Sequence, residues 1–316
     1  MTYCVAMRLD SGLVFLADSR TNAGVDQIST FRKLTVFERP GERLLVMMSA
    51  GNLAITQAVR QIFCEAPDAA DGAEAGPPAA GPGSGSRSVW QARNMFEAVR
   101  RLGEAVRTVH RHDRAALEEA GIEFNCSFLF GGQIRGEPTR LFHVYAAGNF
   151  IEATPENPYF QIGESKYGKP IVDRVITPET SLGEAAKCAL ISMDSTLRSN
   201  ISVGLPLDLL VYEADSLRVT KFVHIDEHNE YMQMIRSTWG TRLRQVFSEI
   251  PDPTWRDAPV AAGAPRLETR ETLPVRAPLP PDLPAPTGAS GAASAPSPPL
   301  ATQTLAQQPP AQHRSG

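Results

Sequence analysis

The start of the chain consists of short apolar runs separated by turn residues, a pattern typical of β-strands. The runs 2–9 and 13–17 flank the tight turn at 10–12, and the second run is apolar throughout. The runs 34–38 and 43–48 flank Arg39-Pro40-Gly41-Glu42, where Pro at the second place and Gly at the third favour a type II turn. We therefore predict two hairpins before residue 50.

Longer segments have the apolar spacing of amphipathic helices. These predicted helices cover 53–63, 89–120, a segment that begins at Ser181, and 227–247. Ser181 and Glu184 have the spacing of a capping box. The predicted buried face of the long helix contains Val89, Phe96, Val99, Val106 and Val109. The face of the last helix contains Tyr231, Ile235, Trp239, Leu243 and Val246.

Further strands are predicted at 125–131, 139–146, near Phe150, near Tyr159, at 207–213 and at 218–222. Strands that cluster along the chain and are joined by hairpins indicate antiparallel sheets instead of alternating βαβ units. Because the strands are apolar on both faces and each helix on only one, the helices must cover the outside. We predict an α+β fold of four layers, αββα.

Two segments have a different composition from the rest. Residues 66–88 are rich in Ala, Gly and Pro, and residues 251–316 contain more than half of the 26 prolines. Such segments cannot bury enough apolar surface to offset the entropy of ordering them. We predict one folded domain over 2–250, with a flexible insertion at 66–88 and a disordered tail at 251–316.

Composition excludes several classes of protein. Apolar residues make up 42% of the chain, charged residues 21%, and the net charge is −4. The folded part has no basic cluster for a nucleic acid, no window for a membrane span and no signal peptide. Four scattered cysteines are typical of reduced thiols. We therefore expect a cytoplasmic protein that binds neither nucleic acid nor membrane.

The N-terminus carries the first candidate chemistry. Removal of Met1, which a small following residue permits, would place the hydroxyl and a free α-amine on Thr2. A terminal amine has a pKa of about 7.7–8.0, so part of it is neutral and able to accept a proton. A threonine activated by its own amine is a known nucleophile. Many cytosolic proteins also begin with Met-Thr and have no such role.

Charged residues follow at two predicted strand ends. Asp18 ends the second strand, and Lys33 precedes the third. In antiparallel sheets both positions can lie beside the N-terminus, where a lysine would stabilise an alkoxide and a carboxylate would orient that lysine. The alternative is that Asp18 caps a turn and Lys33 is solvated.

Ala50-Gly51-Asn52 connects a predicted strand to a predicted helix. Glycine permits close backbone approach, and amides at the start of a helix point toward anions. The Gly51 N–H is therefore a candidate donor to an oxyanion; the alternative is a plain connector.

Taken together, these motifs resemble the proteasome β-subunit superfamily, and most closely the bacterial ancestral-β-subunit family, Anbu. The likeness covers about residues 2–250. It is carried by TYCVAMRLDSGLVFLADSRTNAGVDQISTFRKL, SAGNLAITQAV, FQIGESKYGKPIVDR and SNISVGLPLDLLVYEADSL. It implies the N-terminal-nucleophile hydrolase fold and threonine-type hydrolysis of peptides through an ester on Thr2.

The resemblance also implies roles for individual residues. Thr2 is the nucleophile and, through its amine, the base, Asp18 and Lys33 are its charge partners, and Gly51 supplies the oxyanion hole. The implied lining of the substrate groove is Arg20, Thr21, Asn22 and Ser49. These subunits usually have Gly-Ser-Gly where this chain has Gly163-Glu164-Ser165, so either Glu164 or Ser165 contacts the amine. The later Asp-x-x-Ser element aligns poorly, and the local candidates are Ser199, Asn200 and Ser202.

Three functions remain open at this point. The first is a peptidase in a homo-oligomer, either a ring or an open spiral. The second is an assembled scaffold or binding protein with a vestigial threonine site, which Glu164 and the missing later acid favour. The third is hydrolysis of a small amide. No cofactor or metal is expected, because neither His110-x-His112 nor His224…His228 has the partners of a zinc site. Some relatives work with a partner ATPase, which nothing in this sequence requires.

Overall fold

The computed structural model describes residues 2–23, 27–65 and 88–254. Contacts between Cα atoms divide the chain into Met1–Pro253 and Thr254–Gly316. The predicted insertion except Ser88, and the predicted tail beyond residue 254, lie outside the described residues. In the described part, antiparallel sheets and helices form a mixed α+β fold, which confirms the predicted class.

The first sheet contains the N-terminal strand near its centre. Its order is β10 (Tyr159–Gly163), β1 (Tyr3–Leu9), β2 (Gly12–Asp18), β11 (Leu207–Glu213) and β12 (Lys221–Ile225), and all neighbours are antiparallel. β1 and β2 form the first predicted hairpin. Because β1 has a neighbour on each side, the residues at its start are held by two strands.

The second sheet begins with the other predicted hairpin. Its order is β5 (Leu34–Arg39), β6 (Arg43–Gly51), β7 (Cys126–Ile134), β8 (Arg140–Val144) and β9 (Phe150–Glu152). The turn between β5 and β6 has Gly41 at a φ of 74°, as a type II turn requires. A separate hairpin, β3 (Arg20–Ala23) with β4 (Gln27–Thr30), was not predicted.

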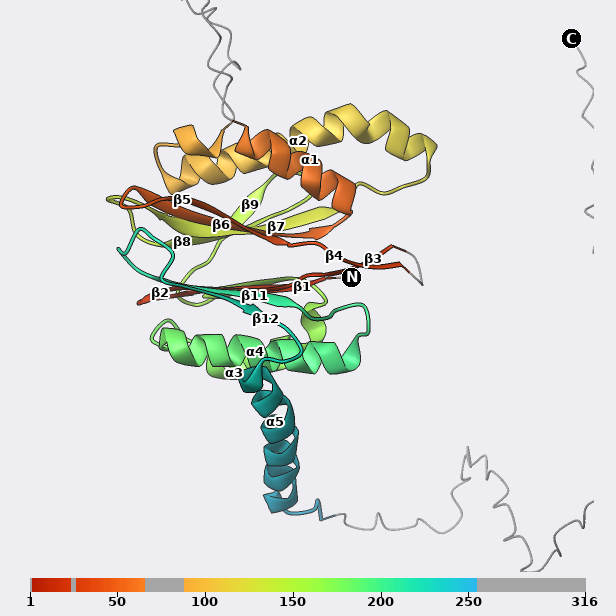
Figure 1. The fold of residues 1–316 in the computed structure, drawn as a ribbon, viewed down its shortest axis with the longest axis vertical. Helices are drawn as coiled ribbons and strands as arrows, with labels where there is room; N and C mark the ends of the chain where they lie inside the picture. Colours follow the sequence, from red (N-terminus) through yellow and green to blue (C-terminus); the bar gives the residue numbers. More distant parts are fainter. Residues whose placement is uncertain (1, 24–26, 66–87, 255–316) are drawn as a thin grey trace, which may run out of the picture. The chain divides into compact units, whose positions relative to one another are not determined.

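The helices cover the outer faces of the two sheets (Figure 1). One side has α1 (Leu53–Cys64), η1 (Val89–Gln91) and α2 (Met95–Glu119). The other side has η2 (Ser165–Tyr167), α3 (Lys169–Val175), α4 (Leu182–Ser199) and α5 (Glu230–Glu249). The capping box predicted at Ser181 and Glu184 is present and starts α4.

Three apolar clusters separate these elements. The cluster between the sheets includes Phe15 and Leu129. The second sheet packs on α1 and α2 through residues such as Phe63 and Phe130, whose rings are 5.6 Å apart. The first sheet packs on α3 and α4 through residues such as Met193. The inner strands β1, β2, β6, β7 and β11 are buried on both faces because each sheet lies between two of these clusters, whereas the edge strands β9 and β12 are largely exposed.

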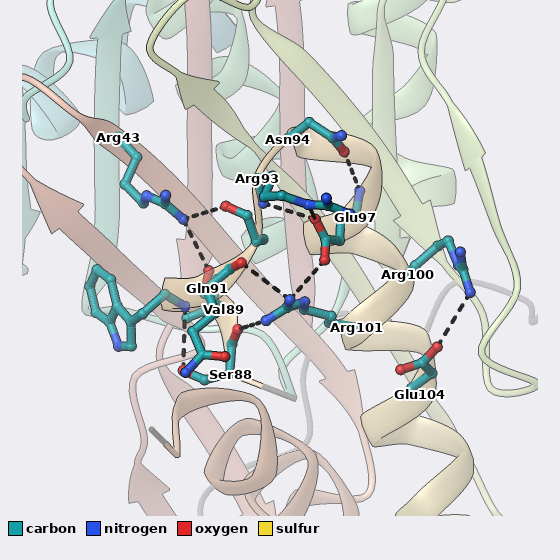
Figure 2. A network of polar contacts seen from close by, with 12 residues as sticks. Arg43, Ser88, Val89, Gln91, Arg93, Asn94, Glu97, Arg100, Arg101 and Glu104 are labelled. Atoms are coloured by element: carbon teal, nitrogen blue, oxygen red, sulfur yellow. Dashed lines mark hydrogen bonds and ion pairs between the residues drawn. The ribbon is translucent and has the colours of Figure 1, made fainter. Parts of the chain in front are cut away.

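The predicted helix 89–120 is interrupted between η1 and α2, which corrects the prediction. The buried Arg43 guanidinium on β6 donates to the carbonyl oxygens of Val89 at 3.2 Å and Ala92 at 2.9 Å. The Val89 carbonyl also accepts from the Ala92 N–H at 3.3 Å, which closes a single 3₁₀ turn, and Arg43 satisfies the Ala92 carbonyl outside any helix. Asn94 then caps α2 by accepting from the Glu97 N–H at 2.7 Å. Figure 2 shows Arg43 and Arg101 converging on this turn.

The Glu97 carboxylate supports the start of α2. The Arg93 N–H, and then the Arg101 and Arg93 side chains, donate to it and lower its pKa to about 2. A carboxyl whose pKa falls on folding stabilises the protein above its unfolded pKa of about 4.3, and this contribution disappears as the pH falls toward 2. We expect Glu97→Gln to lower the unfolding free energy at pH 7 by about 1 kcal/mol or less.

Urea unfolding followed by circular dichroism at pH 7 and pH 3.5 measures this difference, which should shrink at the lower pH. Glu104→Gln is the matched control, because Glu104 only has an exposed ion pair with Arg100 at 3.6 Å. Equal effects of the two variants at pH 7 would contradict the prediction.

The strand predicted at 218–222 begins three residues later, as β12. Asp215 and Leu217 before it have left-handed φ values of 64° and 46°. The connection from β11 uses these residues to turn, so pairing resumes only at Lys221. The apolar Leu217 is buried in a loop and not in a strand.

The predicted apolar face of the last helix is confirmed only in part, because Ile235 is buried and Trp239 lines a cavity with residues of α3 and α4. Met232 and Ile235 in the first turns of α5 are buried, whereas Tyr231, Leu243 and Val246 are about half exposed. The helix points away from α3 and α4 after its first turns, so its later residues have no surface to pack against (Figure 1). No helix of the described residues is long and apolar enough to cross a membrane.

Candidate active site

Thr2 lies at the start of β1 and is held from the side of β10. The Glu164 N–H donates to the Thr2 carbonyl oxygen at 2.7 Å, and Tyr3 pairs with Gly163 in the sheet. Gly163 has a φ of 79°, and a Cβ there would lie 1.9 Å from the Thr2 carbonyl oxygen. Only glycine fits so close to the terminus, and this contact fixes the position of Thr2.

A buried ion pair lies beside this terminus. The Lys33 Nζ atom is 2.7 Å from Asp18 Oδ1, and the side chains are 6% and 0% exposed. Asp18 Oδ1 also accepts from the Tyr3 N–H at 3.0 Å, so Lys33 and the amide that follows Thr2 share one oxygen. Lys33 donates in addition to the Arg20 carbonyl oxygen at 2.6 Å. Asp18 thus connects the ammonium group to the N-terminal strand.

The surroundings of Asp18 act on its pKa in opposite directions. Burial raises the pKa of the carboxyl, whereas the Lys33 charge and the amides of Tyr3 and Gly204 lower it. Both oxygens of the Asp18 carboxylate accept hydrogen bonds, Oδ1 from Lys33 and Tyr3 and Oδ2 from the Gly204 N–H at 3.4 Å. Ionised Asp18 and charged Lys33 are therefore the state that satisfies every group in this cluster.

A cavity of about 570 Å³ opens next to Thr2, and we call it the Thr2 cavity. It is lined by Thr2, Thr21, Ala50, Gly51, Asn52, Leu53, Asn125, Ser127, Gly163 and Glu164. These residues lie in or directly beside β1, β3, β6, the start of α1, β7 and β10, which the fold brings together around this cavity. Thr2 and Gly51 therefore line one cavity, although they are far apart in sequence.

Gly51 ends β6 at a point where no side chain fits. Its φ is 115°, and a Cβ there would lie 2.4 Å from the Asn125 carbonyl oxygen. The next residue, Asn52, caps α1 by accepting from the Ala54 N–H at 3.0 Å. The Asn52 N–H itself donates to the Asn125 carbonyl oxygen at 2.8 Å, so the end of β6 and the start of α1 are held in place where Gly51, Asn52 and Leu53 line the Thr2 cavity.

Neither the protein-family models nor the curated proteins match this chain. Solved structures do, beginning with the ancestral beta-subunit Anbu from Yersinia bercovieri, which is 51% identical over 80% of this chain and 99% of that one, with a TM-score of 0.69. The chain belongs to the Anbu family. Anbu from Hyphomicrobium sp. strain MC1 is 47% identical over 80% and 100%, with a TM-score of 0.68. The Anbu complex from Pseudomonas aeruginosa, a helical assembly, is 46% identical over 80% and 98%, with a TM-score of 0.70.

In this Anbu chain the predicted groove residues lie in different places. Thr21 lines the Thr2 cavity, and its buried hydroxyl has no hydrogen-bond partner among the described residues. The Arg20 guanidinium donates instead to the Ile201 carbonyl oxygen at 3.1 Å. Ser49 lines a neighbouring cavity together with Lys33. Asn22 belongs to β3, and its side chain lies outside the described residues.

The predicted supporting residues also separate. Glu164 lines the Thr2 cavity, whereas Ser165 starts η2 and lines another cavity. Ser202 is not among the residues that line the Thr2 cavity, and its N–H donates to the Asn200 side chain at 2.9 Å. Of these three residues, Glu164 is the one beside Thr2 in this Anbu chain.

One polar contact at the wall of the Thr2 cavity was not predicted from the sequence, and it involves Ser127, which lines the cavity. The Ser127 hydroxyl on β7 is 2.7 Å from His143 Nε2 on β8. Burial lowers the pKa of His143, so the imidazole is neutral at pH 7. No sequence signal marks this pair, because the two residues meet only through the pairing of β7 with β8.

Cys4 on β1 is the nearest alternative nucleophile in sequence to Thr2, and it is fully buried. Burial raises the pKa of its thiol, so the reactive thiolate is suppressed. All four cysteines are free. Cys4 is therefore part of the core between the sheets, as its strand pattern predicts.

Proposed function

We propose that this Anbu protein is a threonine-type peptidase, or amide hydrolase, that uses Thr2 after removal of Met1. The observation that carries the proposal is the buried Lys33–Asp18 pair bonded to the amide next to Thr2, with Gly51 in the same cavity as Thr2. This arrangement supports the four-layer αββα sandwich of the N-terminal-nucleophile hydrolases as the fold. A peptide, or a small amide, is the substrate class.

In the proposed reaction the neutral α-amine of Thr2 takes the proton from the Thr2 hydroxyl. The oxygen attacks the substrate carbonyl carbon, and the Gly51 N–H stabilises the oxyanion that forms. The amine then gives its proton to the leaving nitrogen, and an ester on Thr2 remains. Water, deprotonated by the same amine, breaks that ester and regenerates the hydroxyl.

The charged residues have separate roles in this scheme. The Lys33 ammonium favours the alkoxide and lowers the pKa of the terminal amine, and Asp18 holds the lysine charged and oriented. Glu164, whose amide already binds Thr2, supports the terminal amine in place of the serine usual in the superfamily. Ser165 and Ser202 then act only indirectly, because neither lines the Thr2 cavity.

Intact mass of the purified protein tests the proposal. We expect loss of Met1 and one covalent adduct with a peptide epoxyketone, which reacts with both the hydroxyl and the amine of an N-terminal threonine. Thr2→Ala is the matched control, because an N-terminal alanine keeps the amine and lacks the hydroxyl. Protein that retains Met1 and forms no adduct would refute threonine catalysis.

Glu164 favours the second candidate, an assembled scaffold with an inactive site, because it adds a carboxylate to the Thr2 cavity. The intact Lys33–Asp18 pair favours the enzyme. A structural ion pair requires no open cavity beside it, whereas a catalytic one does, and here the cavity is present.

We also propose that the protein forms a homo-oligomer. We favour an open spiral over a closed ring. The Pseudomonas aeruginosa relative forms a helical assembly. In this chain the end of α5 carries apolar residues on one face that no described residue covers, namely Leu243, Val246, Phe247 and Ile250. A partner ATPase and a cytoplasmic location stay predictions from the sequence.

Charge on this face of α5 is expected to weaken assembly. Phe247 is 79% exposed in the single chain, so Phe247→Glu leaves the fold intact and places a charge in any contact that the face makes. We expect a smaller particle by light scattering after size exclusion. Gln245→Glu on the opposite face of α5 is the control and should keep the particle size of the unaltered protein. If Phe247→Glu also keeps that size, this face of α5 is excluded from the contact.

A further inference from the structure

A second, smaller cavity lies next to the Thr2 cavity, and we call it the Lys33 cavity. Its volume is about 130 Å³, which is room for about four water molecules and hence for one short side chain. Leu53 lines both cavities, and Ser49 of the Lys33 cavity directly precedes Ala50 and Gly51 of the Thr2 cavity. A substrate carbonyl held at Gly51 therefore has the Lys33 cavity beside it.

The charged residues that line the Lys33 cavity are all cations: Arg32, Lys33 and Arg60. Asp18 neutralises Lys33 at 2.7 Å. Arg32 Nε is 3.9 Å from Asp208 Oδ2, beyond hydrogen-bond distance, and Asp208 also binds His224 at 2.9 Å. Arg60 is exposed on α1. The cavity thus carries an excess of positive charge.

Of the three cations, Arg60 is the one least neutralised by a carboxylate. It forms no ion pair with any residue of 2–23, 27–65 or 88–254 for which the structure describes side chains. The remaining lining supplies uncharged donors, in Thr35, Ser49 and Gln57. A carboxylate is the ligand that suits a cavity of cations and neutral donors.

On the basis of the proposed function, we propose that the Lys33 cavity selects an acidic side chain, glutamate or aspartate, on the residue whose carbonyl Thr2 attacks. A peptide that lies extended along the end of β6, with its carbonyl at Gly51, directs that side chain toward Ser49 and Arg60. Arg60 then supplies the charge contact, and the hydroxyl groups orient the carboxylate.

The test uses the full-length protein and four peptide epoxyketones that differ only in the residue attached to the reactive group: Glu, Gln, Leu or Arg. The rate of adduct formation at Thr2 is followed by intact mass. We expect the Glu probe to react about tenfold faster than the isosteric Gln probe, because its carboxylate gains one charge-assisted hydrogen bond. Arg60→Ala should bring the Glu/Gln ratio near one, and Arg60→Glu should reverse the order of the Glu and Arg probes.

Gln61→Glu is the matched control, because Gln61 is the next residue of α1, is exposed and does not line the Lys33 cavity. Its Glu/Gln ratio should equal that of the unaltered protein. Equal rates for all four probes would overturn the acidic preference and leave the proposed function standing. Absence of an adduct with every probe would overturn both.

Discussion

Replacement of Thr2 by Ala is expected to lower the rate of peptide hydrolysis by at least about 10⁴-fold, because removal of a nucleophile leaves only binding and oxyanion contacts. The change removes only a hydroxyl and a methyl group from a residue that β10 holds through its backbone. The fold and the assembly should therefore be unchanged. Turnover of a fluorogenic peptide and the particle mass by light scattering measure the two properties on the same sample.

Thr2→Ser is the matched control, since it keeps the hydroxyl and the terminal amine and should retain turnover. The scaffold hypothesis predicts the reverse pattern, in which Thr2→Ala and the unaltered protein behave alike in every assay. Hydrolysis that survives Thr2→Ala would assign the activity to another group, and Ser127, which lines the same cavity and is hydrogen-bonded to His143, is one candidate.

Replacement of Lys33 by Met is expected to have the second largest effect, because it acts on both stability and catalysis. The change leaves the Asp18 carboxylate, 0% exposed, with only amide donors. Breaking a buried ion pair by removal of one partner costs about 3–5 kcal/mol. We expect a loss of that size in the free energy of unfolding by urea, together with loss of adduct formation at Thr2.

A second substitution separates the two effects. In the double variant Lys33→Met, Asp18→Asn no charge is left buried, so most of the stability should return. Catalysis should not return, because the amine and the alkoxide still lack the ammonium group. A double variant that regains adduct formation would show that Lys33 serves only the fold. Asp18→Asn alone, with Lys33 unpaired, should lose stability as Lys33→Met does.

Local signals account for much of what could be predicted from the sequence. The turns at Gly12 and Gly41, the capping box at Ser181 and the start of α1 after Asn52 all depend on residues within a few positions of each other. The predicted strands and helices therefore lie close to the observed ones. The predictions failed where a distant residue decides: Arg43 interrupts the helix 89–120, and α5 continues beyond the surface on which its apolar stripe would pack.

The sequence by itself determined the two hairpins, the helix start signals, membership of the Anbu family and the presence of Thr2, Asp18, Lys33 and Gly51. Only the tertiary structure decided which of these residues share a cavity. In the folded chain Glu164 and not Ser165 lies next to Thr2. Ser49 lines the Lys33 cavity, and Ser127 contacts His143. The reason is physical: caps and turns are satisfied within a few residues, whereas the walls of a cavity come from strands whose register depends on the packing of the whole core.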